Sequence, residues 1–309
     1  MRVTPVSFAA TCCILLAAAA ACGNENVNTP PSSMAEYEQR LENLRDGSNI
    51  AAITAVIAKD QRIVWSKGFG TADIATQRAA ADTTTYHLAS LTKPFASTVL
   101  LQLVEEGKVS LDDPASKYGV NLSNPAIKVR HLLSMTSEGT PGTQFSYNGD
   151  RFALLETVIA SAAGKSFAAA LEERIIDRLG LNRTAPNPQS GAFSVSGLNK
   201  TTFEANMARG YTYTNRAYSA TSYPTSFGAA AGLTSSALDV AAFSMAMDRD
   251  GTANSSLIVK VPDRGLTFVV LANTDGLSSA YPLGSGKLDS SPWAREFLDT
   301  FVIGSLALP

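Results

Sequence analysis

Residues 87–95 read His-Leu-Ala-Ser-Leu-Thr-Lys-Pro-Phe, and they place a serine and a lysine at the start of a predicted helix. The apolar pattern that follows runs from Phe95 to Glu106 and ends at Gly107, which is typical of a helix closed by a glycine cap. Pro94 is compatible with the first turn of that helix, because a proline lacks the N–H that later turns must donate. We therefore predict that the helix begins close to Ser90.

Ser90 and Lys93 are three residues apart, so on a helix they share one face. The hydroxyl would then lie beside the ammonium, and the free N–H groups of the first turn would offer a place for an oxyanion. A nucleophile, a base and an anion site would thus fall within one turn. A Ser-x-x-Lys tetrad is expected by chance about once in a chain of this length. The alternative is that Ser90 only caps the helix and Lys93 is solvated.

The composition limits the kinds of protein that this chain can be. It has 309 residues, of which 45% are hydrophobic, and a net charge of −2, which suits one large domain or two closely packed ones. No surplus of basic residues points to a nucleic acid partner. The body has no cysteine, and the two histidines of the chain are too few for an ordinary zinc site. We therefore expect no metal and no cofactor.

Residues 1–22 have the features of an export signal. Arg2 is the only charge before an apolar run over 8–21, which is too short to span a bilayer. Residues 19–23 resemble the lipobox of bacterial lipoproteins, in which Cys22 would carry the lipid; ordinary cleavage after an Ala-x-Ala site is the alternative. Residues 23–33 are polar and proline-bearing, as in a flexible tether. We expect an exported protein of the periplasm or cell envelope, with membrane contact only through a lipid anchor.

Predicted strands lie near both ends of the body, and predicted helices fill its middle. Residues 51–58 and 62–68 form one expected hairpin, and residues 257–261 and 266–272 form another. This order predicts an α+β fold, in which an antiparallel sheet is built from both termini, flanked by helices and interrupted by a helical insertion. The domain would span 34–309, with an α/β part over about 34–85 and 255–309 and a helical part over about 86–254. Residues 182–227 show little periodicity and are expected to be irregular.

Tyr147 comes just before a predicted helix over residues 151–163. Tyrosine is a poor base at its ordinary pKa of about 10. A neighbouring lysine ammonium favours the phenolate, so a cluster of serine, lysine and tyrosine can pass a proton without a histidine. The alternative is a loop tyrosine that packs on the core.

Several motifs in this order resemble the serine β-lactamase and penicillin-binding-protein superfamily, in the branch of the class C β-lactamases, related esterases and D-alanyl-D-alanine carboxypeptidases. The motifs are Leu88–Pro94, Val129–Ser137, Pro141–Gly142, Phe145–Tyr147, Val261–Leu266 and Val269–Asn273. The likeness covers about residues 34–301. It implies an α/β sandwich with a helical domain and an active site between them. By this resemblance Ser90 is the nucleophile, Lys93 the family's lysine, and Tyr147 the tyrosine of its Tyr-x-Asn motif.

The chain departs from the family pattern in two places. Gly149 occupies the position of the family's asparagine, and the amide of Asn148 comes one residue early. The family's Lys/His-x-Gly strand, which supplies a second oxyanion N–H, lacks room between Met247 and Leu257. Residues 249–251 could be a degenerate form of this motif, but the end of a helix with a glycine cap, a helix exit, is the better interpretation. We expect one strand fewer, an open cleft, an exposed Lys93 and reduced turnover, because losing one oxyanion donor costs about 10²–10³ in rate.

These features predict an exported serine hydrolase that acts by acyl transfer through a serine acyl-enzyme. Its substrate would be a β-lactam, a D-Ala-D-Ala peptide or a small ester. The alternative is a catalytically impaired protein of the same fold that binds ligands in the cell envelope. A Ser-His-Asp hydrolase of the α/β type is not indicated, because the chain contains no Gly-x-Ser-x-Gly elbow.

Overall fold

The structure is a computed structural model, and it describes residues 29–193, 195, 197–250, 258–273, 291–304 and 306–308. The predicted signal segment, Cys22 and most of the predicted tether lie outside the described residues. Within the described part, no single helix is long and apolar enough to cross a membrane. One bent helix pair, Gly149–Ala163 with Phe167–Leu179, passes the same test by length and composition alone.

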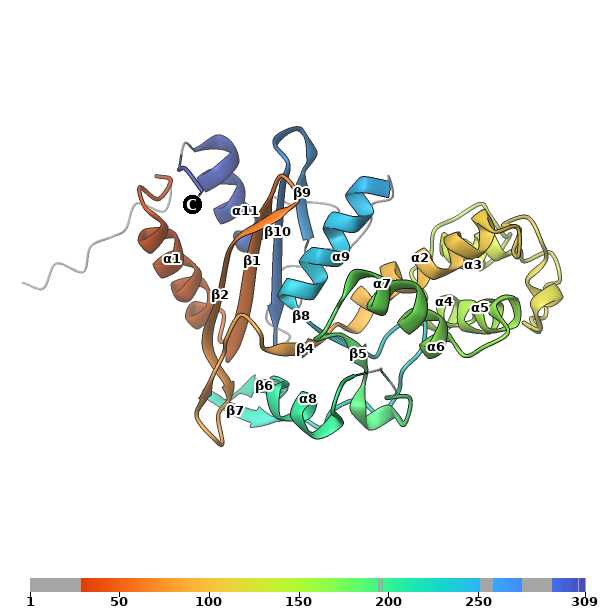
Figure 1. The fold of residues 1–309 in the computed structure, drawn as a ribbon, viewed down its shortest axis with the longest axis horizontal. Coiled ribbons are helices and arrows are strands. Elements are labelled where there is room, and N and C mark those ends of the chain that lie inside the picture. The colour runs from red at the N-terminus through yellow and green to blue at the C-terminus, as the bar shows by residue number, and fades with distance from the viewer. Residues whose placement is uncertain are drawn as a thin grey trace, which may run out of the picture.

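The main sheet brings the two ends of the domain together. Its described strands run antiparallel in the order β3-β2-β1-β10-β9 (Figure 1). Their bounds are β1 (Ala52–Lys59), β2 (Arg62–Asp73), β3 (Arg78–Ala79), β9 (Ile258–Val261) and β10 (Leu266–Ala272). The centre of the sheet is the pairing of β1 with β10, from Ile53 opposite Ala272 to Lys59 opposite Leu266. Both predicted hairpins and the α+β class are confirmed.

Strand β1 is buried on both faces. Its side chains point alternately to the two faces, and those on each face pack in a different hydrophobic cluster. Ile53, Ala55 and Ile57 pack in the cluster that includes Tyr37 and Phe297. Val56, which lies on the opposite face, belongs to the larger cluster. This division follows from the period of two along a strand. Helices α1 (Met34–Gly47) and α11 (Pro292–Leu298) cover the first face, and α9 (Ala237–Asp250) packs on β1 and β10 from the other (Figure 1).

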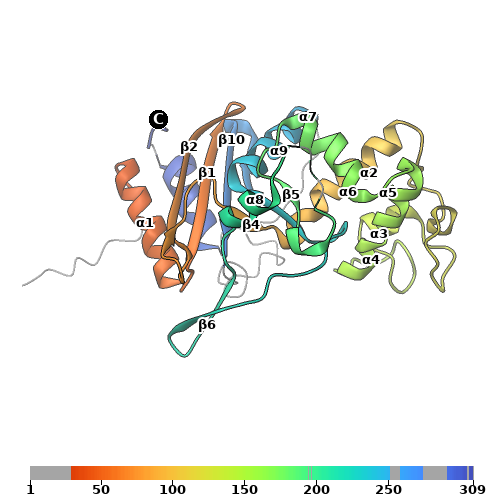
Figure 2. The same ribbon diagram turned by 60° about the horizontal axis from the view of Figure 1, so that its bottom comes forward.

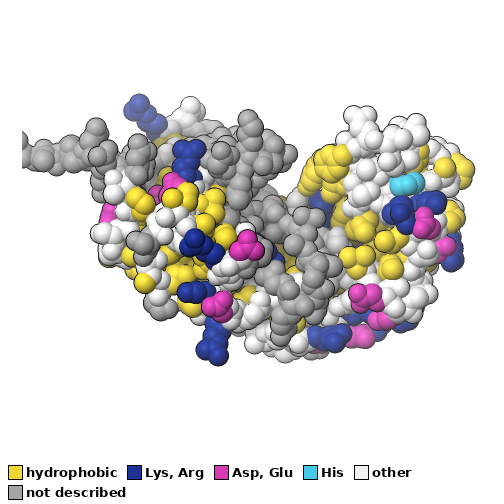
Figure 3. Space-filling view, turned by 90° about the horizontal axis from the view of Figure 1, so that it is seen from above, with side chains coloured by type: hydrophobic (Ala, Val, Ile, Leu, Met, Phe, Trp, Pro, Cys, Tyr) yellow, Lys and Arg dark blue, Asp and Glu magenta, His cyan; other side chains and the backbone are white. Residues whose placement is uncertain are grey.

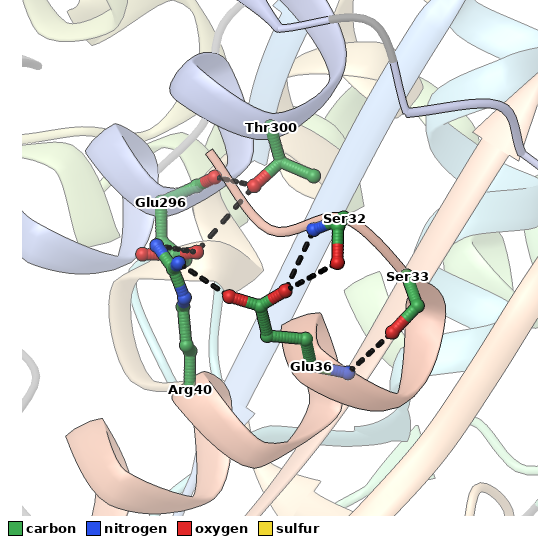
Figure 4. Close-up of polar contacts among 6 residues, drawn as sticks. All are labelled: Ser32, Ser33, Glu36, Arg40, Glu296 and Thr300. Carbon is green, nitrogen blue, oxygen red and sulfur yellow. Dashed lines mark hydrogen bonds and ion pairs between the residues drawn. The ribbon is translucent and has the colours of Figure 1, made fainter. Parts of the chain in front are cut away.

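The first helix begins at a side-chain cap and is tied to the last helix by charge. Ser33 Oγ accepts a hydrogen bond from the Glu36 N–H, as an N-cap does (Figure 4). Arg40 forms an ion pair with Glu36 at 2.7 Å and another with Glu296 of α11 at 3.6 Å. These contacts fix α1 to α11 across the face of the sheet that they cover together.

The helical part surrounds α2 (Thr92–Glu105), whose buried face contacts α5 and α6. The other helices are α3 (Val129–Leu133), α4 (Gly149–Ala153), α5 (Leu155–Ala163), α6 (Phe167–Leu171) and α7 (Asp177–Leu179). The helix predicted over 151–163 is divided at Leu154 into α4 and α5. Figure 2 shows this part standing beside the sheet rather than over it. The expected helical range of 86–254 also contains α9, which packs on the sheet.

The prediction that residues 182–227 are irregular was wrong. This region contains β5 (Ala185–Pro186), α8 (Lys200–Asn206), β6 (Tyr211–Thr214) and β7 (Ala217–Ala220). Asn199 caps α8 through its side chain. Asn215 and Arg216 both have positive φ, which gives the tight turn between β6 and β7. The hairpin projects from the body (Figure 2), and Tyr211 is the one residue of its two strands that is buried, which gives a prediction little to recognise.

A small second sheet connects the helical part to the main sheet. Strand β8 (Leu233–Ser236) pairs with β4 (Thr85–His87) on one side and with β5 on the other. Strand β4 leads directly into the Ser90 turn, and β8 leads directly into α9. The turn that carries Ser90 is therefore anchored between the two parts of the domain.

Among the described residues, β9 is the outermost strand of its side of the main sheet. Arg249 and Asp250 lie within α9, as the helix-exit interpretation requires. Residues 251–257, where a further strand would have to form, lie outside the described residues. The absence of the Lys/His-x-Gly strand therefore stays a prediction.

Candidate active site

Ser90 lies in a short 3-10 turn, Ala89–Leu91, and the α-helix begins two residues later at Thr92. Ala89 has a φ of +46°, a conformation that a residue with a Cβ adopts only at a cost. This turn projects the Ser90 side chain from the end of β4 ahead of the helix. The predicted position of the helix start was thus close, but the serine precedes the helix rather than forming its first turn.

Thr92 fastens the strained turn to its surroundings. Its Oγ1 donates to the Ala89 carbonyl at 2.7 Å and accepts from the Leu233 N–H of β8 at 3.1 Å. The Leu88 N–H also donates to the Leu233 carbonyl at 2.8 Å. Thr92 is fully buried, so these bonds are not exchanged with water. The sheet therefore holds the nucleophile turn in its unusual conformation.

The Lys93 ammonium is directed at the serine. Its Nζ donates to Ser90 Oγ at 2.9 Å and to the Ala230 carbonyl at 2.9 Å. The rings of Tyr147 and Phe152 lie 5.2 and 5.6 Å from Nζ, close enough for cation–π attraction. Only 8% of Lys93 is exposed, so the expectation of an exposed lysine was wrong. The two rings and the chain at Ala230 cover it.

Tyr147 completes the cluster from the opposite side. Its hydroxyl shares a hydrogen bond of 2.6 Å with Ser90 Oγ, although 58% of the side chain is exposed. Partial burial raises the pKa of Tyr147, but the hydrogen bonds from Ser90 and Lys93 and the charge of Lys93 outweigh it. The pKa consequently lies below its ordinary value of 10.0. The packing alternative for Tyr147 does not describe a side chain that is this exposed and bonded to the serine.

All three predicted catalytic residues therefore meet at one point. Ser90 Oγ lies between an ammonium that donates to it and a phenol that can take its proton. Such an arrangement is suited to a Tyr147 phenolate that serves as a base, with the Lys93 charge stabilising the phenolate. No histidine is needed for the proton transfer.

The segment that carries the Ala230 carbonyl is itself held in place. Gly228 and Ala231 form an antiparallel bridge, and the Ala229 N–H donates to the Glu156 carboxylate of α5. Burial raises the pKa of Glu156, and the bond from Ala229 opposes this rise. Glu156 and Ala230 were not identified from the sequence, because no local spacing relates α5 to this segment.

The side-chain amide of Asn148, one residue before the position of the family's asparagine, is bonded to groups of its own loop and of α4. Asn148 Oδ1 accepts from the Arg151 N–H at 3.0 Å and thereby caps α4. Asn148 Nδ2 donates to Glu138 Oε1 at 2.6 Å. Both ends of this amide are thus used to shape the loop, whereas the resemblance would have assigned an asparagine to the site.

A largely apolar cavity of about 430 Å³ begins at Lys93 and continues between α2 and α9. Its walls include Leu91, Phe95, Leu101, Met135, Phe152, Val240, Phe243 and Met247. Seen from above, the molecule is hollowed between its two parts, and hydrophobic side chains gather on the flank of the helical part that faces the hollow (Figure 3). The Lys93 side chain borders both the cavity and Ser90, so the cavity adjoins the catalytic cluster.

His87 precedes Ser90 by three residues, but its ring packs on Tyr223. Its ring is tilted against that of Tyr223, with centroids 5.1 Å apart, and both ring nitrogens are buried without a hydrogen-bond partner among the described residues. Burial lowers the pKa of His87 from 6.5 to about 4. These contacts indicate a packing role for His87 beside Tyr223.

This histidine is expected to make the fold sensitive to acid. Between pH 6.5 and about 4 the unfolded chain binds a proton at His87 that the folded chain does not, so stability falls as the pH falls through this window. Thermal unfolding at pH 7 and pH 4.5 measures the loss. A His87→Phe variant, which keeps the ring on Tyr223, should lose less stability between the two values. An equal loss in both proteins would show that His87 is not responsible.

Comparisons with known proteins bear on the family and the fold of this chain. The Beta-lactamase family model matches residues 37–259. Among curated relatives, Protein flp of Staphylococcus aureus (strain N315) is 30% identical over 111 residues, which are 34% of this chain and 22% of that protein. Esterase EstB of Burkholderia gladioli is 29% identical over 110 residues, covering 33% of this chain and 27% of the esterase. The chain thus spans about a quarter of each of these two relatives.

Solved structures share the fold at low sequence identity. The octameric penicillin-binding protein homologue from Pyrococcus abyssi superposes with a TM-score of 0.70 at 20% identity, over 85% of this chain and 77% of that one. EstCE1, a hydrolase with promiscuous acyltransferase activity, gives a TM-score of 0.64 at 18% identity, over 84% and 97%. The motifs, the fold and the match over residues 37–259 together show that this chain belongs to the beta-lactamase family.

Proposed function

We propose that this protein is a serine hydrolase that forms an acyl-enzyme on Ser90. The observation that carries this proposal is the hydrogen-bonded chain from Lys93 through Ser90 to Tyr147, with distances of 2.9 and 2.6 Å. Relatives named as an esterase and as an acyltransferring hydrolase support a hydrolytic reaction.

In the proposed reaction, Ser90 Oγ attacks the carbonyl carbon of the substrate while its proton passes to the Tyr147 oxygen. In this proposal the Ser90 N–H donates to the resulting oxyanion. The bond to the leaving group then breaks as Tyr147 returns the proton to the departing oxygen. Water then adds to the ester carbonyl carbon on Ser90 as its proton passes to the Tyr147 oxygen. Tyr147 returns that proton to Ser90 Oγ as the bond between Ser90 and the acyl group breaks, which releases the acid and restores the serine and the phenolate.

Among the three substrate classes that the sequence left open, we favour small esters with an apolar acyl group. The cavity beside Lys93 has a volume typical of small-molecule sites and mostly apolar walls. Its one lysine besides Lys93, Lys260, donates to the Ser244 carbonyl at 3.2 Å. An alkyl chain would bury apolar area there, at roughly 25 cal/mol per Å², whereas a charged group would lose hydration.

The test is hydrolysis of p-nitrophenyl esters from acetate to octanoate. We expect turnover that improves with chain length, and a Ser97→Trp variant, which fills the cavity from α2, should reduce kcat/KM for octanoate by about 10-fold or more while sparing acetate. Ser161→Trp, on an exposed position of α5, is the matched control. If Ser97→Trp does not change the chain-length preference, the cavity does not bind the acyl chain. If no ester is hydrolysed, the protein is not an ester hydrolase.

The competing proposal is a binding protein that does not turn over its ligand. Labelling of Ser90 by an active-site probe distinguishes the two. A fluorophosphonate forms a stable phosphonyl ester on a working serine nucleophile, so it labels the site irrespective of how fast an acyl-enzyme would be hydrolysed. Labelling without ester turnover would indicate a site that acylates but does not release. Absence of labelling at Ser90 would favour the binding protein.

A further inference from the structure

Tyr147 is exposed over more than half of its surface, so packing does little to hold it on Ser90. An exposed tyrosine normally samples several rotamers. Its hydroxyl nevertheless has to stay within hydrogen-bond distance of Ser90 Oγ for the proton transfer of the proposed function. Something other than a surrounding core must therefore restrict the backbone from which the ring extends.

The two neighbours of Tyr147 are bound by a single carboxylate. Ser146 Oγ donates to Glu138 Oε2 at 2.5 Å, and Asn148 Nδ2 donates to Glu138 Oε1 at 2.6 Å. Each oxygen of Glu138 thus holds one flank of the tyrosine. The hydrogen bond from Ser146, and to a smaller extent the one from Asn148, lowers the pKa of Glu138. The carboxylate therefore stays ionised at neutral pH and accepts both bonds.

The loop is attached to rigid structure at further points. The Ser146 N–H donates to the Met135 carbonyl at 2.8 Å, and Asn148 caps α4 by accepting from the Arg151 N–H. Met135 is buried in the larger core cluster. Glu138 therefore links a tyrosine-bearing loop to a segment that the core immobilises. Its carboxylate is the one group in this arrangement that contacts both flanks.

We infer that Glu138 is a positioning residue for Tyr147 and sets the alignment of the tyrosine with Ser90. This inference rests on the proposed function, in which Tyr147 takes the proton of Ser90. Glu138 acts through the geometry of the loop: its charge is not among the causes that shift the pKa of Tyr147. The early amide of Asn148 has a use in this scheme, because it is one of the two groups that Glu138 holds.

Glu138→Ala should lower kcat for ester hydrolysis by about 10- to 100-fold with little change in KM, because misplacing a catalytic group by about 1 Å costs on this order. Glu138→Gln should recover most of the loss, since its amide oxygen can accept from Asn148 and its NH₂ can donate to Ser146. Asp150→Ala is the matched control, because it removes an exposed carboxylate two residues beyond Asn148.

A Tyr147→Phe background separates positioning from general damage. In that background Glu138→Ala should cost less than about twofold, because the group it aligns is already absent. Unchanged kcat in Glu138→Ala, or the same loss with and without the Tyr147 hydroxyl, would overturn the inference, as would a Glu138→Gln variant as slow as Glu138→Ala. Ser90→Ala tests the proposed function separately: if hydrolysis survives that change, the function fails whatever Glu138 does.

Discussion

Replacing Ser90 by alanine is expected to lower ester hydrolysis by on the order of 10⁴–10⁶-fold, to the level of a protein without a nucleophile. Ser90 Oγ is the atom that both Lys93 and Tyr147 contact, and no substitute hydroxyl is placed between them in the described site. The measurement is steady-state turnover of the best p-nitrophenyl ester, corrected for the uncatalysed rate.

The fold should survive this change. Ser90 is only partly buried and lies in a turn that Thr92 and Leu88 fix independently of its side chain. Thermal unfolding of Ser90→Ala should therefore match that of the unmodified protein, and Ser161→Ala on exposed α5 should match it in both stability and rate. Hydrolysis by Ser90→Ala within about tenfold of the original rate would remove Ser90 from the role of nucleophile.

The second large effect concerns the pair that moves the proton. Lys93→Met, which keeps the volume of a buried side chain, and Tyr147→Phe should each reduce kcat/KM by about 10²–10⁴-fold, the usual contribution of a general base. The double variant should lose little more than the worse single variant, because the two residues act as one unit. Losses that multiply would show that they act separately.

The pH profile gives an independent view of the same pair. Tyr147 works as a base only when ionised, so the rate should rise with pH through the pKa of Tyr147, which lies below 10.0. Tyr147→Phe should lose this rise. Retention of the rise in Tyr147→Phe would assign the titration to another group.

Much of the fold follows from local patterns in the sequence. The hairpins that became β1 with β2 and β9 with β10 show apolar runs bounded by polar turns, and α2 shows a helical stripe ended by a glycine. The projecting hairpin and α8 were missed because each buries a single residue, Tyr211 and Phe203 respectively, which is too few to produce a recognisable periodicity.

The site was predicted only in part, because sequence patterns relate residues that are close in the chain and not those that tertiary packing brings together. Ser90 and Lys93 are close in sequence, and the family motifs supplied Tyr147. Glu138, Glu156 and the Ala230 carbonyl reach the cluster through loop closure and tertiary packing, which no spacing rule expresses. The burial of Lys93 was misjudged because the prediction considered only the sheet side of the cleft, whereas the cover comes from two aromatic rings.

The central claim is that Ser90 carries the acyl group during turnover. Mass spectrometry of the intact protein, quenched in acid during reaction with a p-nitrophenyl ester, followed by peptide mapping, measures this directly. We predict one added acyl group on the peptide that contains Ser90, and none in Ser90→Ala treated in the same way. An acyl adduct on another residue would contradict the account. So would ester hydrolysis that requires Ser90 but leaves no acyl adduct on the protein at any quench time.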